Sequence, residues 1–416
     1  MFYRKTVLEN GVTVITESID TVRSVALGIW FSVGSRDESE PEAGMSHFME
    51  HMIFKGTPSL TAAQISETFD GLGAELNAFT SKEYTCFYAR LVDEHLPVAV
   101  EVLSDMVVSS LLADDAAEKE REVVIEEIAR MEDTPDDRIH EIFSRALWPT
   151  HPIGLPILGS RETVGSFGHC AASAFHTKHY VTGNCVVAAA GNLDHDNVVA
   201  LVRTHLNLPE GPCNARPSAA AVSSSRLTVL DKDTEQAHIC YGVATMNAHH
   251  EDRFVLTILD TILGGGMSSR LFQEIREKKG LAYSVYSFHS LYRDTGQLTV
   301  YAGTRPSNTE EVVRLIQAEV EKMRISGADG EELHRAKESI KGHLVLGMES
   351  TRNRMTRLGK NLVTDGELLS ADELVERINA VTAADIKRVA EETFGSERVL
   401  AILGPHSAES VSHLVG

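Results

Sequence analysis

The pattern of apolar and polar positions predicts a strand near the start of each half of the chain. The segments are SVALGIWFSV, which begins at Ser24, and HICYGVAT, which begins at His238. Runs rich in β-branched and aromatic residues are typical of strands. Ahead of the first, MFYRKTVLENGVTVITESID contains two more strand-like segments around Asn10 and Gly11, a dipeptide that favours a hairpin turn.

The same order of predicted elements recurs in both halves. A helix follows each first strand, around 47–54 and around 253–263, and then come further strands, long amphipathic helices and a closing strand. The later matching segments are NAFTSKEYTCFYARL against GLAYSVYSFHSLY and GQLTVYAGT, and NCVVAAAGNL against ERVLAILGPH. This order indicates a diverged internal duplication. Strands in runs followed by groups of helices predict an α+β fold with mainly antiparallel sheets flanked by helices.

Length and a change in composition predict two domains. A chain of 416 residues exceeds the usual size of one hydrophobic core. Between the halves, LPEGPCNARPSAAAVSSS concentrates Pro, Gly, Ser and Ala, which is typical of a linker. We therefore predict an N-terminal domain at 1–210, a linker at 211–225 and a homologous C-terminal domain at 226–416.

Composition argues against several classes of partner. The net charge of −21 and the lack of clustered Lys and Arg disfavour nucleic acid, because phosphate contacts need such clusters. No run approaches the ~18 apolar residues of a membrane span, and the N-terminus lacks the apolar segment of a secretory signal. Five cysteines without a CxxC pair fit a reducing compartment. We expect a cytoplasmic protein without a nucleic-acid or membrane partner.

The stretch GMSHFMEHMIF, which begins at Gly44, carries the most informative chemistry. With Ser46 as the candidate N-cap, His47, Glu50 and His51 are spaced i, i+3 and i+4 and share one face of a helix. Two imidazoles one turn apart reach a single cation, and catalytic zinc typically has three protein ligands plus water. Glu50 lies between them, at the place of a general base, in the H-x-x-E-H arrangement. A chance pattern among 18 histidines is the competing explanation.

A third ligand is expected on the helix predicted at 114–133. One stripe of this helix is partly apolar and its neighbour is wholly charged. The first comprises Glu120, Val124, Glu127 and Met131, with Ile128 beside it; the second comprises Lys119, Glu122, Glu126 and Arg130. Glu127 is therefore expected to face inward as the third ligand, and Glu126 to face water. Glu120, ~10 Å away along the axis, is expected to accept the spare N–H of a ligating histidine.

These residues resemble the pitrilysin/insulinase family of zinc metallopeptidases, and more closely its mitochondrial processing peptidase-like branch. The likeness covers nearly the whole chain. It is carried by GMSHFMEHMIFKGT, by EREVVIEEIARMEDTPDD, and by the 75 residues between His51 and Glu127. It implies the metallohydrolase fold of the processing peptidases, two homologous domains around a chamber, and one Zn²⁺ per chain.

Two further segments match the same family. Its edge strand corresponds to ELNAFT, so that Asn77, Ala78 and Phe79 would pair with an extended peptide. Its Arg and Tyr pair corresponds to Arg276 and Tyr283, which would reach over from the second domain. The hydroxyl of Tyr283 would then stabilise the developing oxyanion while Arg276 holds the carbonyl region. Taken without the resemblance, these two residues are better explained as an ordinary core tyrosine and a surface arginine.

The residues and the resemblance together predict a zinc endopeptidase that hydrolyses unfolded or short peptides, with Glu50 as general base. The resemblance also implies a homodimer. The second half reads ESIKGHL where a third ligand would fall, so it is expected to lack a metal site. Three alternatives stay open: a non-catalytic peptide-binding or core subunit, one subunit of a processing peptidase that needs a partner chain, and a zinc hydrolase with a non-peptide substrate.

Overall fold

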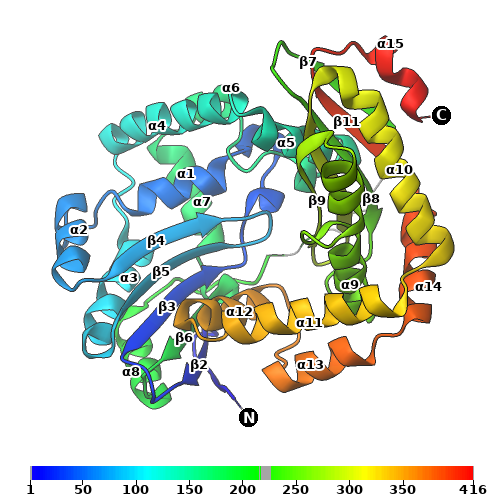
Figure 1. The fold of residues 1–416 in the computed structure, drawn as a ribbon. Helices are drawn as coiled ribbons and strands as arrows, with labels where there is room; N and C mark the ends of the chain where they lie inside the picture. The colour runs from blue at the N-terminus through cyan, green and yellow to red at the C-terminus, as the bar shows by residue number, and fades with distance from the viewer. Residues whose placement is uncertain (1, 215, 217–225, 416) are drawn as a thin grey trace. The chain divides into compact units, whose positions relative to one another are not determined.

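The computed structural model describes residues 2–214, 216 and 226–415, and the chain forms two compact units (Figure 1). Unit 1 comprises Met1–Ala129, Leu155–Pro217 and Leu346–Leu368, and unit 2 comprises Arg130–Gly154, Ser218–Val345 and Leu369–Gly416. The units differ from the predicted boundaries because each half of the chain gives one segment to the other unit. Most of the linker predicted at 211–225 lies outside the described residues.

Unit 1 contains a six-stranded sheet in the order β1-β2-β6-β3-β5-β4. The pair β2 and β6 is parallel, and the other neighbours are antiparallel. The hairpin predicted at Asn10 and Gly11 joins β1 to β2. The strands are β1 (Arg4–Val7), β2 (Thr13–Ser18), β3 (Ser24–Phe31), β4 (Glu75–Thr80), β5 (Thr85–Val92) and β6 (Cys185–Gly191).

Unit 2 contains a five-stranded sheet in the order β7-β11-β8-β10-β9. Only its pair β7 and β11 is parallel. Without β1, the first sheet has the same order and the same parallel pair, which is what an internal duplication requires. The strands are β7 (Leu227–Asp231), β8 (Ala237–Thr245), β9 (Ala282–Leu291), β10 (Gly296–Thr304) and β11 (Arg398–Gly404).

Helices cover both faces of the unit 1 sheet. Most of them enclose a large core that includes Phe48, Leu103 and Val124. The opposite face is covered by α12 (Figure 1). Its Met355 and Leu358 pack with Trp30 of β3. The helices are α1 (Met45–Ile53), α2 (Ala62–Gly71), α3 (Leu96–Ser109), α4 (Asp114–Glu132), α6 (Arg161–Gly165), α7 (His169–His179), α8 (His195–His205) and α12 (Thr351–Val363).

The unit 2 sheet is covered in the same way. Helices α9, α10 and α14 enclose one core, and α5 packs its Ile139 and Phe143 against β8 and β11 on the other face. The helices are α5 (Pro135–Leu147), α9 (Arg253–Gly264), α10 (Thr309–Ser326), α11 (Gly330–Gly347), α13 (Ala371–Ala380), α14 (Ala383–Phe394) and α15 (Ala408–Val411), with a π-helical segment η6 (Phe272–Lys278).

Two findings bear on the predicted compartment. No single helix in the described part of the chain is long and apolar enough to cross a membrane, and only the bent pair Asp93–Ser109 and Asp114–Glu132 passes by length and composition together. All five cysteines are free thiols.

Short single-turn helices connect several of these elements. They are η1 (Ser35–Asp37), η2 (Glu40–Glu42), η3 (Asp93–His95), η4 (Pro152–Gly154), η5 (Thr182–Asn184), η7 (Pro306–Asn308) and η8 (Ser412–Val415).

The close approach of α12 to the sheet predicts a destabilising substitution. A Cβ at Gly359 would lie 2.3 Å from the indole of Trp30. Overpacking of about 1 to 3 kcal/mol should outweigh the gain in helix propensity of about 1 kcal/mol from Gly to Ala. Gly359→Ala should therefore lower the Tm in thermal denaturation.

The matched control is Gly342→Ala on α11, where nothing beyond the helix's own nearby backbone lies within 4 Å of the added Cβ. Only the propensity gain acts there, so its Tm should equal or exceed that of the wild type. A Tm for Gly359→Ala at or above the wild-type value would contradict the packing argument.

Candidate active site

Helix α1 presents two histidines and a glutamate on one face. Its apolar residues are buried in the unit 1 core, which fixes the rotation of the helix about its axis; they are Met45, Phe48, Met49, Met52 and Ile53. His47, Glu50 and His51 occupy the remaining face, and the two imidazole rings have centroids 4.7 Å apart. The N-cap is Gly44, so the prediction that Ser46 is the N-cap is wrong. Ser46 is buried within the first turn.

Helix α4 places Glu127 beside these rings. Its Oε2 atom lies 3.5 Å from Nε2 of His47 and 3.5 Å from Nε2 of His51. Candidate ligand atoms of the three residues all lie within 4.8 Å of one another. Buried Val124 and Ile128 on the same helix turn Glu127 inward, whereas the neighbouring residue Glu126 is exposed. The structure thus brings together the three side chains expected to bind the metal.

Glu120 contacts the far side of the His51 ring. His51 Nδ1 donates to Glu120 Oε2 at 3.0 Å, which leaves its Nε2 directed toward Glu127. The second oxygen of the buried Glu120 carboxylate pairs with Lys55 Nζ at 2.7 Å. Lys55 was not among the predicted residues, although its position four residues after His51 was a usable signal. Such outer contacts orient a ligating ring and fix its tautomer.

Glu50 is held from the sheet. Its Oε2 accepts a hydrogen bond of 2.6 Å from the hydroxyl of Thr80, the last residue of β4. Burial raises the pKa of Glu50, and the Thr80 hydroxyl opposes that shift. Sequence reasoning missed Thr80 because nothing in its local pattern distinguishes it from an ordinary strand threonine.

The donor set fits zinc. Burial, with a smaller effect of His51, lowers the pKa of His47 to about 4, so this imidazole is neutral at pH 7. Neutral imidazole nitrogens and a carboxylate oxygen are the ligands of catalytic zinc sites. No other cluster of three or more His, Cys, Asp or Glu side chains with this spacing occurs in the described part of the chain.

Strand β4 lies at the edge of the unit 1 sheet, next to α1. Asn77 is exposed, and its Oδ1 accepts a hydrogen bond of 2.8 Å from the backbone N–H of Ala78. The Phe79 ring packs on the Trp30 side of the sheet, at 5.4 Å between centroids, whereas Thr80 faces Glu50. The Phe79 side chain therefore lies on the opposite face of the strand from the side chain that contacts Glu50.

Arg276 and Tyr283 contact each other within unit 2. The Arg276 guanidinium lies 4.6 Å from the ring centroid of Tyr283 and 4.6 Å from that of Phe272. Tyr283 is 80% exposed at the start of β9. Arg276 belongs to the π-helical η6, and such segments are frequent at functional sites. Tyr283 also lines a cavity of about 530 Å³ together with Asp136 and Asp137.

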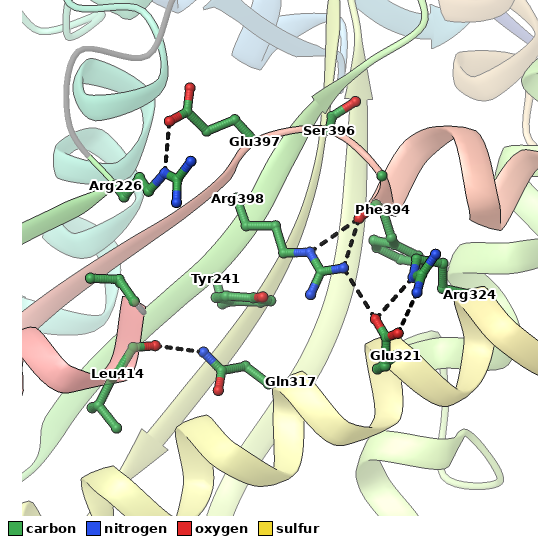
Figure 2. A pocket seen from close by; sticks show the side chains of 12 residues that line it. Arg226, Tyr241, Gln317, Glu321, Arg324, Phe394, Ser396, Glu397, Arg398 and Leu414 are labelled. Carbon is green, nitrogen blue, oxygen red and sulfur yellow. Dashed lines mark hydrogen bonds and ion pairs between the residues drawn. The ribbon is translucent and has the colours of Figure 1, made fainter.

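A second cavity in unit 2, of about 700 Å³, contains none of the predicted site residues (Figure 2). Its charged groups are largely paired with one another. Arg324 and Arg398 both bind the carboxylate of Glu321, and Arg226 donates to Glu397 at 2.9 Å. Each of these charged side chains therefore already has a partner within the cavity wall.

Solved structures share the fold over nearly the full length. A protease from Helicobacter pylori superposes with a TM-score of 0.91 at 24% identity, covering 97% of this chain and 99% of that one. A Pseudomonas fluorescens structure titled as a peptidase M16 inactive domain has a TM-score of 0.92 at 21% identity and covers 98% of both chains. A chain of complex III2 from Candida albicans has a TM-score of 0.85 at 20% identity, covering 98% and 97%. The fold class is that of the two-domain M16 peptidases.

Sequence comparison gives the same class. The family model described as insulinase (peptidase family M16) matches residues 13–161, and the one described as peptidase M16 inactive domain matches 171–340. A Mycobacterium tuberculosis protein named as an uncharacterized zinc protease is 42% identical over 98% of this chain and 94% of its own length. Another zinc protease so named, from Bacillus subtilis, is 41% identical over 95% and 97%. The chain belongs to peptidase family M16, which confirms the predicted resemblance to the pitrilysin/insulinase family.

Proposed function

We propose that the protein is a zinc-dependent endopeptidase that hydrolyses unfolded or short peptides. The observation that carries the proposal is the convergence of His47, His51 and Glu127 in unit 1, with Glu50 on the same helical face. The names of the relatives in Mycobacterium tuberculosis and Bacillus subtilis support it.

In this proposal His47, His51 and Glu127 hold one Zn²⁺. When bound, zinc supplies Lewis-acid activation of water and of a substrate carbonyl. Glu50 accepts the proton of the attacking water and delivers a proton to the leaving amine. Thr80 fixes one oxygen of Glu50, and Glu120 orients the His51 ring, so neither group needs to reorganise during the reaction.

The substrate is proposed to bind in extended form along β4. The edge position of this strand supports the idea, because main-chain pairing binds peptides with little sequence preference. Asn77, Ala78 and Phe79 are the proposed contacts. For unit 2 we propose that Tyr283 donates a hydrogen bond to the developing oxyanion and that Arg276 contacts the carbonyl region. Stacking of Arg276 on the exposed Tyr283 ring supports their acting as a pair.

We also propose a homodimer that acts on peptides in the cytoplasm, without a nucleic-acid or membrane partner. The net charge of −21 supports the absence of a nucleic-acid partner, and the free state of all five cysteines supports a reducing compartment. The homodimer is proposed from the family resemblance alone. Sedimentation of the purified protein and fractionation of cells test these assignments, and a monomer or a membrane-bound pool would contradict them.

Metal removal tests the proposed function directly. Purified protein should contain about one zinc per chain and cleave an unstructured peptide. A chelator should abolish cleavage, and added zinc should restore it. Cleavage that survives complete removal of the metal, or a protein that never binds zinc stoichiometrically, would contradict the proposal.

One observation favours a second candidate, a subunit without activity of its own. The Pseudomonas fluorescens structure titled as a peptidase M16 inactive domain shares the fold, so the fold alone does not require peptidase activity. A protein that binds zinc but cleaves only after a second chain is added would be one subunit of a processing peptidase. Zinc binding without cleavage under any condition would favour the non-catalytic subunit.

A further inference from the structure

The loop that precedes α1 carries a buried carboxylate against the first turn of that helix. Glu38 lies between η1 and η2 and is 2% exposed. Its two oxygens accept hydrogen bonds from the backbone N–H of Gly44 at 2.8 Å and of Ser46 at 2.6 Å. The first N–H groups of a helix have no acceptor within the helix, and negative charge is favoured at this end. Glu38 thus caps the helix that carries His47.

Gly44 explains why the cap comes from outside the helix. It has a φ of +96°, and a Cβ there would lie 2.6 Å from the carbonyl oxygen of Leu158 and 2.9 Å from Cα of Gly159. The usual N-cap residues Ser, Thr, Asp and Asn therefore meet both backbone strain and a steric clash at this position. Because the N-cap residue has no side chain, another residue must accept the N–H groups.

The loop around Glu38 is itself held in place. Asp37 accepts two hydrogen bonds from the Arg216 guanidinium, each of 2.7 Å, and Arg36 pairs with Glu83 at 2.6 Å. All four of these side chains are at most 5% exposed. The two residues before Glu38 are thus fixed to the body of unit 1, so its carboxylate presents a rigid acceptor.

Stability alone does not account for this arrangement. Burial raises the pKa of Glu38 to about 7, against the opposing effect of hydrogen bonds from Ser46 and Gly44. A buried carboxylate opposes folding unless its hydrogen bonds offset the desolvation. An apolar residue with a differently capped helix would avoid that cost.

We infer that Glu38 is a positioning residue for the metal centre, because it fixes the first turn of α1 and with it the orientation of His47. The inference rests on the proposed zinc site. Without this cap the first turn would fray in the zinc-free protein, and zinc binding would have to order it. Glu38 therefore acts on metal affinity through preorganisation, without touching the metal.

The variant Glu38→Gln tests the inference, since it keeps the size but replaces one acceptor oxygen with an N–H₂ donor. Competition with a fluorescent chelator should show the Kd for zinc raised by roughly tenfold or more, within the range for residues that orient ligands.

The matched control is Glu42→Gln. Glu42 accepts the backbone N–H of Ser39 at 3.1 Å in the same loop, whereas the N–H groups at the start of α1 are bound by Glu38. Its Kd should stay within about twofold of wild type. An unchanged Kd for Glu38→Gln, or an equal rise in both variants, would overturn the inference.

A second measurement does not depend on the variant folding. In zinc-free wild-type protein, the amides of Gly44 and Ser46 should exchange slowly with deuterium, whereas uncapped amides in a first helical turn exchange fast. Fast exchange at both would overturn the inference. Neither measurement uses peptide cleavage, so a wild type that binds zinc but cleaves nothing would contradict only the proposed function.

Discussion

Glu50→Gln is expected to reduce peptide cleavage by about 10² to 10⁴ fold in kcat while the protein retains its zinc. The amide cannot accept the proton from the attacking water, but it preserves the size of the side chain and can still accept the hydrogen bond from Thr80. The measurement is the turnover of an unstructured peptide, with metal analysis of the same preparation.

The control for this variant is Glu126→Gln, which makes the same chemical change at an exposed position on α4. Its turnover should match that of wild type. Equal cleavage by wild type and Glu50→Gln would remove Glu50 from the mechanism. Loss of zinc from Glu50→Gln would instead indicate that Glu50 is itself a ligand.

Glu127→Gln is expected to weaken zinc binding by more than the roughly 10- to 100-fold that is usual for residues that only orient ligands. The Glu127 Oε2 atom lies 3.5 Å from Nε2 of both histidines. Because the other two proposed ligands are imidazoles, this carboxylate is the one anionic ligand of the set. A neutral amide oxygen is a much poorer partner for a divalent cation. Chelator competition gives the affinity, and cleavage at limiting zinc should fall in parallel.

Glu126→Gln again supplies the contrast, because its neighbouring position on α4 points to solvent. Zinc affinity should be unchanged in that variant. Loss of zinc from Glu126→Gln but not from Glu127→Gln would show that α4 rotates about its axis in the metal-bound protein, and that the apolar pattern of the helix selects the wrong carboxylate.

Much of the site followed from periodicity. The spacing of His47, Glu50 and His51 places them on one helical face, and buried Val124 and Ile128 orient Glu127. Both arguments depend only on residues one or two turns apart. The alternating patterns likewise predicted the strands of both sheets except β7 (Leu227–Asp231), and their common order explains why the duplication was visible.

Residues that act across the fold were not predictable in this way. Thr80 reaches Glu50 from a different element, and Glu38 caps α1 across a turn whose shape depends on the close contact of Gly44 with Gly159. Ser46 is a residue type that often serves as an N-cap, but Gly44, with its positive φ, takes that place, so the helix starts two residues earlier than an N-cap at Ser46 would allow. Backbone geometry of this kind leaves no periodic signal.

The sequence pattern also could not predict which helices cover which sheet. An amphipathic helix shows that it has an apolar face, but not which sheet that face meets. Helix α5 comes from the first half of the chain and packs on β8 and β11, while α12 comes from the second half and packs on β3 and β6.

This exchange of helices limits how the protein can be divided. A fragment that ends at residue 210 would carry every proposed zinc ligand but would leave Trp30 and its apolar neighbours without the cover of α12. A minimal zinc-binding fragment would instead need residues 346–368 supplied by a fusion or a rearranged chain order. Neither repeat therefore encodes a complete folding unit, and the two halves cannot be separated into independent domains by cutting the chain once.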